Sequence, residues 1–177
     1  LARLIILLAG LPETTPGATV NRLCSSSLTA LQMAADSIRA GTNSQMVVGG
    51  VEHLGHVPMT AALGYHPDIF KSYDFQWTNM GLTAEKLSED FDINRTEQDV
   101  FAVESNRRHF DAREAGFLGR EMVPVTLPDG KVITEDQEPR LSTLESLVGL
   151  RTVFKENGTV TAANSSGISD GACMAWV

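Results

Sequence analysis

The stretch 18–51 constrains what this chain can fold into more than any other part of its 177 residues. Residues 18–23 read as a short strand, and residues 46–51 form an apolar run typical of a strand buried on both faces of a parallel sheet. Between them lie apolar residues at helical spacing and a glycine suited to end a helix: Leu28, Leu31, Ala35, Ile38 and Gly41. Strand, helix and strand in this order predict a right-handed βαβ unit with parallel strands, and therefore an α/β fold.

The middle of the chain predicts a mixed insert between two core-like pieces. We expect irregular structure over 58–78, helices over 81–91 and 96–116, a hairpin over 123–133 and a short helix over 142–150. A strand over 158–163, a tight loop over 164–167 and a final strand or helix from 170 follow. The predicted domains are a core segment, 1–59, an inserted lid, 60–155, and a return to the core, 156–177.

Both ends of the chain read as interrupted elements. Residues 1–10 lack an initiator methionine and predict the tail of a buried helix, with the apolar centre of a signal peptide as the alternative. Residues 172–177 read as a buried strand. We therefore interpret the sequence as a piece of a longer protein.

Charge and composition exclude several function classes. The formal net charge is −8, and no basic stripe or polybasic patch argues for nucleic acid or a membrane surface. No apolar run is long enough to span a bilayer. Two widely separated cysteines predict neither a disulfide framework nor a zinc site, and we expect reduced thiols. The predicted compartment is the cytoplasm, with an organelle left open.

Cys24 is the strongest candidate for chemistry. It stands at a strand-to-helix turn, before Ser25, Ser26 and Ser27, which suit a helix N-cap. The partial positive charge and free N–H groups of a helix N-terminus favour a thiolate and can hold an oxyanion. The alternative is a small buried hydrophobic residue, and we interpret Cys173 in that way, as core.

The histidines do not identify a base for that thiol. His53 and His56 stand three residues apart after the second strand, without a convincing third metal ligand, so structural roles are favoured over a metal site. The loop 164–167 can bind a polar ligand or be an ordinary turn, and the turn 79–81 is favoured as a plain helix start.

Four segments together resemble the thiolase family. Residues 20–27 resemble the segment around its acyl-accepting cysteine, and 48–52 resemble the strand that follows. Residues 80–85 resemble part of its loop domain, and 158–172 resemble the glycine- and serine-containing loop beside the pantetheine. Residues 50–59 are similar to the degradative enzymes of fatty-acid β-oxidation.

The resemblance implies a fold, a reaction and a set of residues. The fold is a thiolase-like βαβαβ layered α/β fold with an inserted α+β loop domain. The reaction is acyl-CoA C-acyl transfer: 3-ketoacyl-CoA and CoA give acyl-CoA and acetyl-CoA, or condense in reverse, through an acyl-cysteine. Cys24 is then the nucleophile, and its backbone N–H is part of the oxyanion hole. Met80 lies against the acyl channel, Ser166 bonds the pantetheine, and Arg140 approaches the CoA nucleotide. Coenzyme A is a co-substrate, and no metal or other cofactor is implied.

Departures from the family pattern limit what the chain can do alone. Ala163 replaces a usual glycine, and Asn79 stands where some members have histidine. The family's histidine base and second cysteine belong to a C-terminal half that this sequence lacks, so we expect the 177 residues alone to be inactive and to expose apolar surface.

Two other readings stay open beside the enzyme. The chain is alternatively a non-catalytic acyl-CoA-binding or assembly module derived from a thiolase, or a relative of the ketosynthases, which the segments 80–85 and 162–167 disfavour. The family implies a homodimer or homotetramer, with a hydratase/dehydrogenase subunit of a β-oxidation complex as a further partner.

Overall fold

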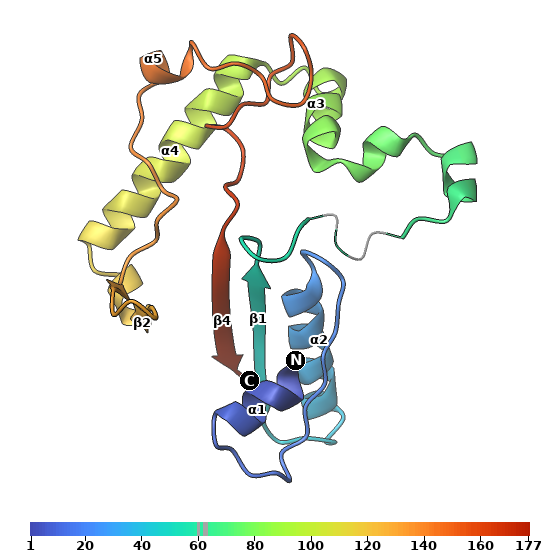
Figure 1. The fold of residues 1–177 in the computed structure, drawn as a ribbon, viewed down its shortest axis with the longest axis vertical. Coiled ribbons are helices and arrows are strands. Elements are labelled where there is room, and N and C mark those ends of the chain that lie inside the picture. The colour runs from blue at the N-terminus through green and yellow to red at the C-terminus, as the bar shows by residue number, and fades with distance from the viewer. Residues whose placement is uncertain (60, 62–63) are drawn as a thin grey trace. The chain divides into compact units, whose positions relative to one another are not determined.

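The computed structural model describes residues 1–59, 61 and 64–177, whose path is drawn in Figure 1. These residues form two compact units, one of 1–59 with 169–177 and one of the described residues in 60–168. Residues 60, 62 and 63, at the start of the predicted insert, lie outside the described residues. The second unit continues to 168, whereas the predicted insert ends at 155.

The first unit combines two helices with a two-stranded sheet. Its elements are α1 (Ala2–Leu8), α2 (Ser26–Arg39), β1 (Val47–His53) and β4 (Asp170–Trp176). The strands β1 and β4 lie side by side and antiparallel, in a register that runs from Val47↔Trp176 to His53↔Asp170. Two mutual N–H···O bonds of 2.8 Å between Met46 and Val177 extend this ladder by one rung.

The predicted strand over 18–23 is wrong, and so is the parallel pairing expected between it and β1. A strand needs a neighbouring backbone to satisfy its N–H and C=O groups. In this segment side chains bond the backbone instead: the Leu23 N–H donates to Asn21 Oδ1 (2.9 Å) and the Arg22 N–H to Ser26 Oγ (2.9 Å). The partner of β1 comes from the far end of the chain.

The predicted helix is confirmed as α2, and it packs on one face of the strand β1. The α2 helix ends as expected at Gly41 (φ +73°), where N–H groups of residues 41 and 42 donate to the Ile38 and Ser37 carbonyls. A Cβ on Gly50 would overlap the Ser27 hydroxyl, so glycine lets the first turn of α2 lie directly on β1.

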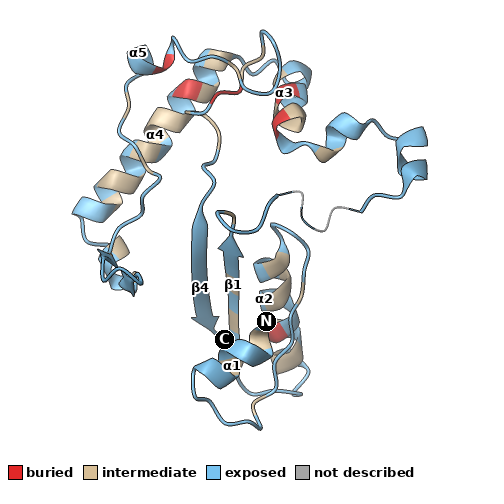
Figure 2. Cartoon of the chain, viewed as in Figure 1, coloured by how far each residue is buried: buried red, intermediate tan, exposed pale blue. Residues whose placement is uncertain are grey.

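Within the described residues most of the sheet stays exposed, which overturns three expectations of burial. Figure 2 shows β4 exposed along its whole length. Met174 and Trp176 are each 71% exposed, and Val47 and Val51 are half exposed. Cys173 is exposed rather than core. A two-stranded sheet with one covering helix cannot bury both of its faces. The α1 helix forms as expected, but it likewise has no buried residue.

The second unit confirms the predicted helices and hairpin. It comprises 3-10 helices η1 (Pro67–Lys71), η2 (Phe75–Thr78) and η3 (Leu118–Arg120), helices α3 (Met80–Asp90), α4 (Arg95–Glu114) and α5 (Leu144–Leu147), and strands β2 (Val125–Thr126) and β3 (Val132–Ile133). The strands β2 and β3 pair antiparallel, and Gly130 of their turn has φ +86°. The strand expected over 158–163 is wrong, because these residues form a loop bonded mainly by side chains.

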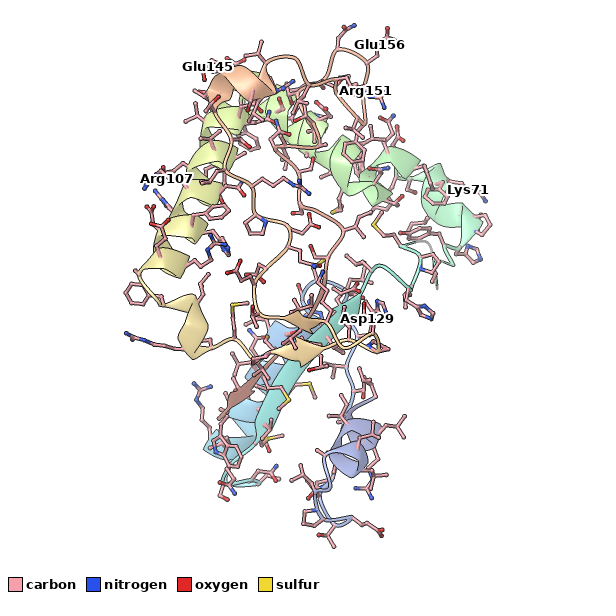
Figure 3. All side chains as sticks on the ribbon, turned by 60° about the vertical axis from the view of Figure 1, so that its left-hand side comes forward. Lys71, Arg107, Asp129, Glu145, Arg151 and Glu156 are labelled. Carbon is pink, nitrogen blue, oxygen red and sulfur yellow. The ribbon has the colours of Figure 1, made fainter. Side chains whose placement is uncertain are left out.

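The α4 helix begins earlier than the sequence suggested. Asn94, not Thr96, is its N-cap, and Asn94 and Glu97 each accept the other's backbone N–H in a capping box. Farther along, Glu104 accepts from Arg107 (2.7 Å) and Arg108 (2.7 Å). Arg107 projects outward from α4 (Figure 3). Hydrogen bonds from Arg107 and then Arg108 lower the pKa of Glu104 to about 2.

The described residues bury little apolar surface. Their buried apolar residues are Ala34, Leu147 and Val160, while Glu85, Asp99 and Thr161 are buried although polar. In the second unit the buried positions gather on α3, α4, α5 and the loop 158–165 (Figure 2). Within the described residues, none of the helices combines the length and apolar character needed to cross a bilayer.

Candidate active site

Cys24 stands on a tight, strained turn. The preceding residue, Leu23, has φ +52°, a conformation that costs a residue with a Cβ about 1–2 kcal/mol. Ser26 holds the turn, because its hydroxyl accepts the Arg22 N–H and donates to the Leu23 carbonyl at 2.6 Å. Asn21 holds it from the other side through the Leu23 N–H. Strain of this kind, fixed by neighbouring groups, is typical of functional sites.

The turn leaves both the thiol and several backbone donors free. Cys24 is exposed and comes two residues before the first residue of α2. Among the described residues, the N–H groups of Cys24, Ser27 and Leu28 have no hydrogen-bond partner. Unpaired N–H groups at the start of a 14-residue helix form a site for negative charge. The local geometry therefore suits a nucleophile whose attack on a carbonyl creates an oxyanion.

No histidine is bonded to this thiol in the part of the chain that the structure describes. His53 Nδ1 lies 2.9 Å from Asp170 Oδ2, and its ring is 5.2 Å from that of His56. The Gly55 N–H donates to Asp170 Oδ1 (2.9 Å) and, together with the smaller effect of His53, lowers the pKa of Asp170. This geometry agrees with a structural role for His53. Among the described residues, no three His, Cys, Asp or Glu side chains lie close enough together to hold a metal ion.

Met80 is the first residue of α3 and is 69% exposed. Asn79 is the N-cap, and its Oδ1 accepts the N–H groups of Gly81 (2.9 Å) and Leu82 (3.2 Å). The turn 79–81 is thus a helix start, as the sequence favoured. The cap also fixes where the Met80 side chain emerges from the helix.

Arg140 and Ser166 lie on two loops that meet in the second unit. The Arg140 N–H donates to Asn106 Oδ1 of α4 at 2.9 Å, and the guanidinium takes part in none of the ion pairs found among the described residues. A Cβ on Gly167 would overlap the carboxylate of Glu138, so the chain next to Ser166 packs closely on the segment before Arg140. Both residues are exposed.

The predicted residues are therefore divided between the two units. Cys24 belongs to the first, and Met80, Arg140 and Ser166 belong to the second, where the loops of Arg140 and Ser166 are brought together. Sequence reasoning missed the residues that hold these positions: Asn21 and Ser26 at the thiol, and buried Glu85 and Asp99 beside the loop 158–165. The signal for Glu85 was an acidic residue between the apolar positions Leu82 and Leu87.

Comparisons with known proteins point one way. The family model described as thiolase, N-terminal domain, matches residues 1–177. The chain is 44% identical over 178 residues to a 3-ketoacyl-CoA thiolase of Shewanella frigidimarina, covering 97% of this chain and 46% of that protein. The chain spans about half the length of the curated relatives it matches.

Solved structures agree with this match. The dimeric peroxisomal thiolase of Saccharomyces cerevisiae is similar with a TM-score of 0.88 and 33% identity, over 98% of this chain and 46% of that one. Human mitochondrial 3-ketoacyl-CoA thiolase, solved in complex with CoA, is similar with a TM-score of 0.84 and 32% identity, over 99% and 48%. The expected α/β layered fold is confirmed by these similarities.

Proposed function

We propose that this chain, which belongs to the thiolase family, carries the nucleophile and CoA-contacting loops of an acyl-CoA C-acyltransferase. The observation that supports the proposal most is the exposed Cys24 on its strained turn, where its own N–H and two N–H groups at the start of α2 have no partner among the described residues. The similar proteins carry the names 3-ketoacyl-CoA thiolase and probable acetyl-CoA acyltransferase.

The proposed reaction has two halves. The Cys24 thiolate attacks the 3-keto carbon of a 3-ketoacyl-CoA, and its electron pair forms the new C–S bond while the carbonyl oxygen becomes an oxyanion held by backbone N–H groups. The oxyanion then collapses, the C2–C3 bond breaks, and the released carbanion takes a proton to leave as acetyl-CoA. In the second half the thiolate of free CoA attacks the acyl-cysteine, gives the shortened acyl-CoA and regenerates Cys24.

Three residues of the second unit are proposed to hold the co-substrate. Met80 would lie against the acyl chain, Ser166 would hydrogen-bond the pantetheine, and Arg140 would pair with the nucleotide phosphates. Exposure of all three supports these roles, as does the contact between the loops of Arg140 and Ser166. A local cation suits a chain of net charge −8 that must take a polyanionic ligand.

The 177 residues alone are proposed to lack turnover. The family's histidine base and second cysteine have no assigned counterpart here, and the described residues expose many large apolar side chains. A homodimer or homotetramer, with a hydratase/dehydrogenase subunit as a further partner, is proposed for the whole protein. β-Oxidation is the proposed pathway and the cytoplasm the proposed compartment. Relatives named peroxisomal and mitochondrial leave an organelle open.

Domain roles belong to the same proposal. Residues 1–59 would contribute the core that presents Cys24, 60–155 an inserted lid, and 156–177 the return to the core. Support comes from the 1–59 segment, which shares one compact unit with 169–177.

Acylation tests the proposal directly. The complete polypeptide that contains this sequence is incubated with acetyl-CoA, and peptide mass spectrometry locates the acetyl adduct. We expect the adduct on Cys24, lost in Cys24→Ala and retained in Cys173→Ala, a matched control because Cys173 is also exposed. CoA binding without any adduct would favour the non-catalytic binding module, and equal adducts on both cysteines would contradict a dedicated nucleophile.

A further inference from the structure

The loop 158–165 has a buried centre, Val160 and Thr161, without being part of a sheet. Val160 is 6% exposed and Thr161 is fully buried. Among the described residues, the backbone partners of this stretch are an isolated bridge between Thr152 and Thr161, a bond from the Val153 N–H to the Val160 carbonyl (3.0 Å) and a bond from the Gly158 N–H to the Lys155 carbonyl (3.1 Å). Buried N–H groups need acceptors. Here the acceptors are side chains of α3 and of the loop itself.

Glu85 of α3 supplies the first anchor. It is 4% exposed, and its two carboxylate oxygens accept the N–H groups of Thr159 (2.8 Å) and Val160 (2.8 Å). The Thr159 hydroxyl donates a third bond at 3.0 Å. A Cβ on Gly158 would overlap this carboxylate, so glycine permits the close approach. A buried carboxylate bonded to two successive N–H groups fixes that backbone firmly.

Asn164 supplies the second anchor. Its Oδ1 accepts the Thr161 N–H (2.7 Å), and its Nδ2 donates to Asp99 Oδ1 (3.0 Å). Asp99 is itself 5% exposed and bonded to Arg95 of α4 at 2.7 Å. Ser165 closes the loop by donating to the Thr161 carbonyl at 2.5 Å. The backbone is thus held from 159 up to the residue immediately before Ser166.

The α3 helix carries both Glu85, the first anchor of the loop, and Met80, a second residue proposed to contact the substrate. Met80 is its first residue, and Glu85 follows five positions later. The same rigid helix therefore sets the place of Met80 directly and the place of Ser166 through Glu85 and the loop.

We infer that Glu85 is a positioning residue that holds the loop 158–166 in register with Met80, so that Ser166 is preorganised to bind the pantetheine arm of CoA. The inference rests on the proposed function. Glu85 touches no substrate in this role and acts through the backbone of Thr159 and Val160. We expect its contribution in CoA binding rather than in the chemical step, because Glu85 contacts neither the thiol end of the pantetheine nor the reacting carbonyl in this role.

The test replaces Glu85 in the complete polypeptide. Glu85→Gln keeps the shape but turns one acceptor oxygen into an NH2 donor that faces an N–H donor, which leaves a buried group unpaired. Glu89→Gln is the matched control: Glu89 lies one turn farther along α3 and pairs with Lys155 at the surface, so it loses a charge without touching the loop backbone. Thr159→Val is a milder second variant, since it keeps both backbone bonds to Glu85 and removes the hydroxyl's bonds to Glu85, Ser88 and Gln98.

Three readouts separate positioning from general loss of structure. We expect Glu85→Gln to raise the calorimetric Kd for CoA and the KM for CoA about tenfold, with kcat within a factor of two. Thr159→Val should raise both about threefold and Glu89→Gln should leave them unchanged. Partial unfolding would reduce the active fraction and hence the apparent kcat, but not raise KM. Hydrogen exchange at residues 159–161 should be faster in Glu85→Gln than in Glu89→Gln.

The outcomes distinguish failure of the proposed function from failure of the proposed role of Glu85. A wild-type protein that binds no CoA overturns the proposed function and the role of Glu85 with it. A wild-type protein that binds CoA, with Glu85→Gln and Thr159→Val binding as tightly, overturns only the role of Glu85. A fall in kcat at constant KM in both variants also overturns it, since that result indicates a purely structural role.

Discussion

Replacing Gly50 by alanine is expected to displace the first turn of α2, and Cys24 with it. The new Cβ would overlap the Ser27 hydroxyl, and the Ser27 Cβ would lie 3.2 Å away. Overpacking of this kind costs about 1–3 kcal/mol. Because the hydroxyl is the end of a short side chain that can rotate, we expect the lower part of that range, about 1–2 kcal/mol.

The matched control for this change is Gly171→Ala on the neighbouring strand β4. A Cβ on Gly171 would meet no atom within 4 Å, so its effect should stay within about 0.5 kcal/mol. Ser27→Ala removes the overlapping oxygen, and the double variant Gly50→Ala/Ser27→Ala should recover most of the lost stability. The residual 3.2 Å contact asks for a shift of only a few tenths of an ångström.

Two assays follow the perturbation from packing to chemistry. Urea unfolding of the complete polypeptide measures the free energy of unfolding, and mass spectrometry measures the rate of Cys24 acetylation by acetyl-CoA. A displacement of about 1 Å at a reacting group can cost about 100-fold in rate. We expect acetylation in Gly50→Ala to slow at least about tenfold while most of the protein stays folded. If Gly50→Ala and Gly171→Ala have the same free energy of unfolding and the same rate of Cys24 acetylation, the proposed displacement of α2 is wrong.

Two further predictions concern backbone strain and charge. Leu23→Gly should raise the free energy of unfolding by about 0.5–1 kcal/mol relative to Leu23→Ala, because glycine relieves the cost of φ +52° at a side chain that is 76% exposed. Thermal unfolding of the two variants measures the difference. A lower melting temperature for the glycine variant would contradict the prediction. The lowered pKa of Glu104, about 2 against an ordinary 4.5, contributes stability above pH 4.5 that is lost as the pH falls toward 2. Acid titrations followed by circular dichroism should show this loss of stability in the wild type and a smaller loss in Glu104→Gln. Identical titration curves for the two proteins would contradict the prediction.

Local signals explain the parts that were predictable. The α2 helix follows from apolar residues at helical spacing and Gly41, and the β2–β3 hairpin from the turn around Gly130. The turn at Cys24 was predictable from its place just before a helix, although the bonds of Asn21 and Ser26 that hold it were not. Such elements are specified by residues within a few positions of one another.

Burial and strand pairing could not be predicted from local patterns, because both depend on residues far away in the sequence. The segment 46–51 has the composition of a doubly buried strand, but its exposure depends on which elements cover it. Among the described residues, α2 covers it at Gly50. Cys173 was assigned to the core on residue type, yet it is exposed, because α2 packs on β1 and leaves β4 exposed along its length. Glu85 is an acidic residue within a predicted helix, and its bonds to the loop 158–165 are what reveal it as an acceptor.

The sequence by itself determined the family, the helices, the hairpin and the placing of Cys24 at a helix start, since each rests on short-range patterns or on motifs in a recognisable order. The tertiary structure was needed to show that β1 pairs antiparallel with β4, that Cys173 is exposed and that Glu85 accepts from the backbone of the loop 158–165. The physical reason is sequence separation. Gly55 and Asp170 are bonded across 115 positions, and Glu85 and Val160 across 75, so neither contact leaves a mark on its own neighbourhood.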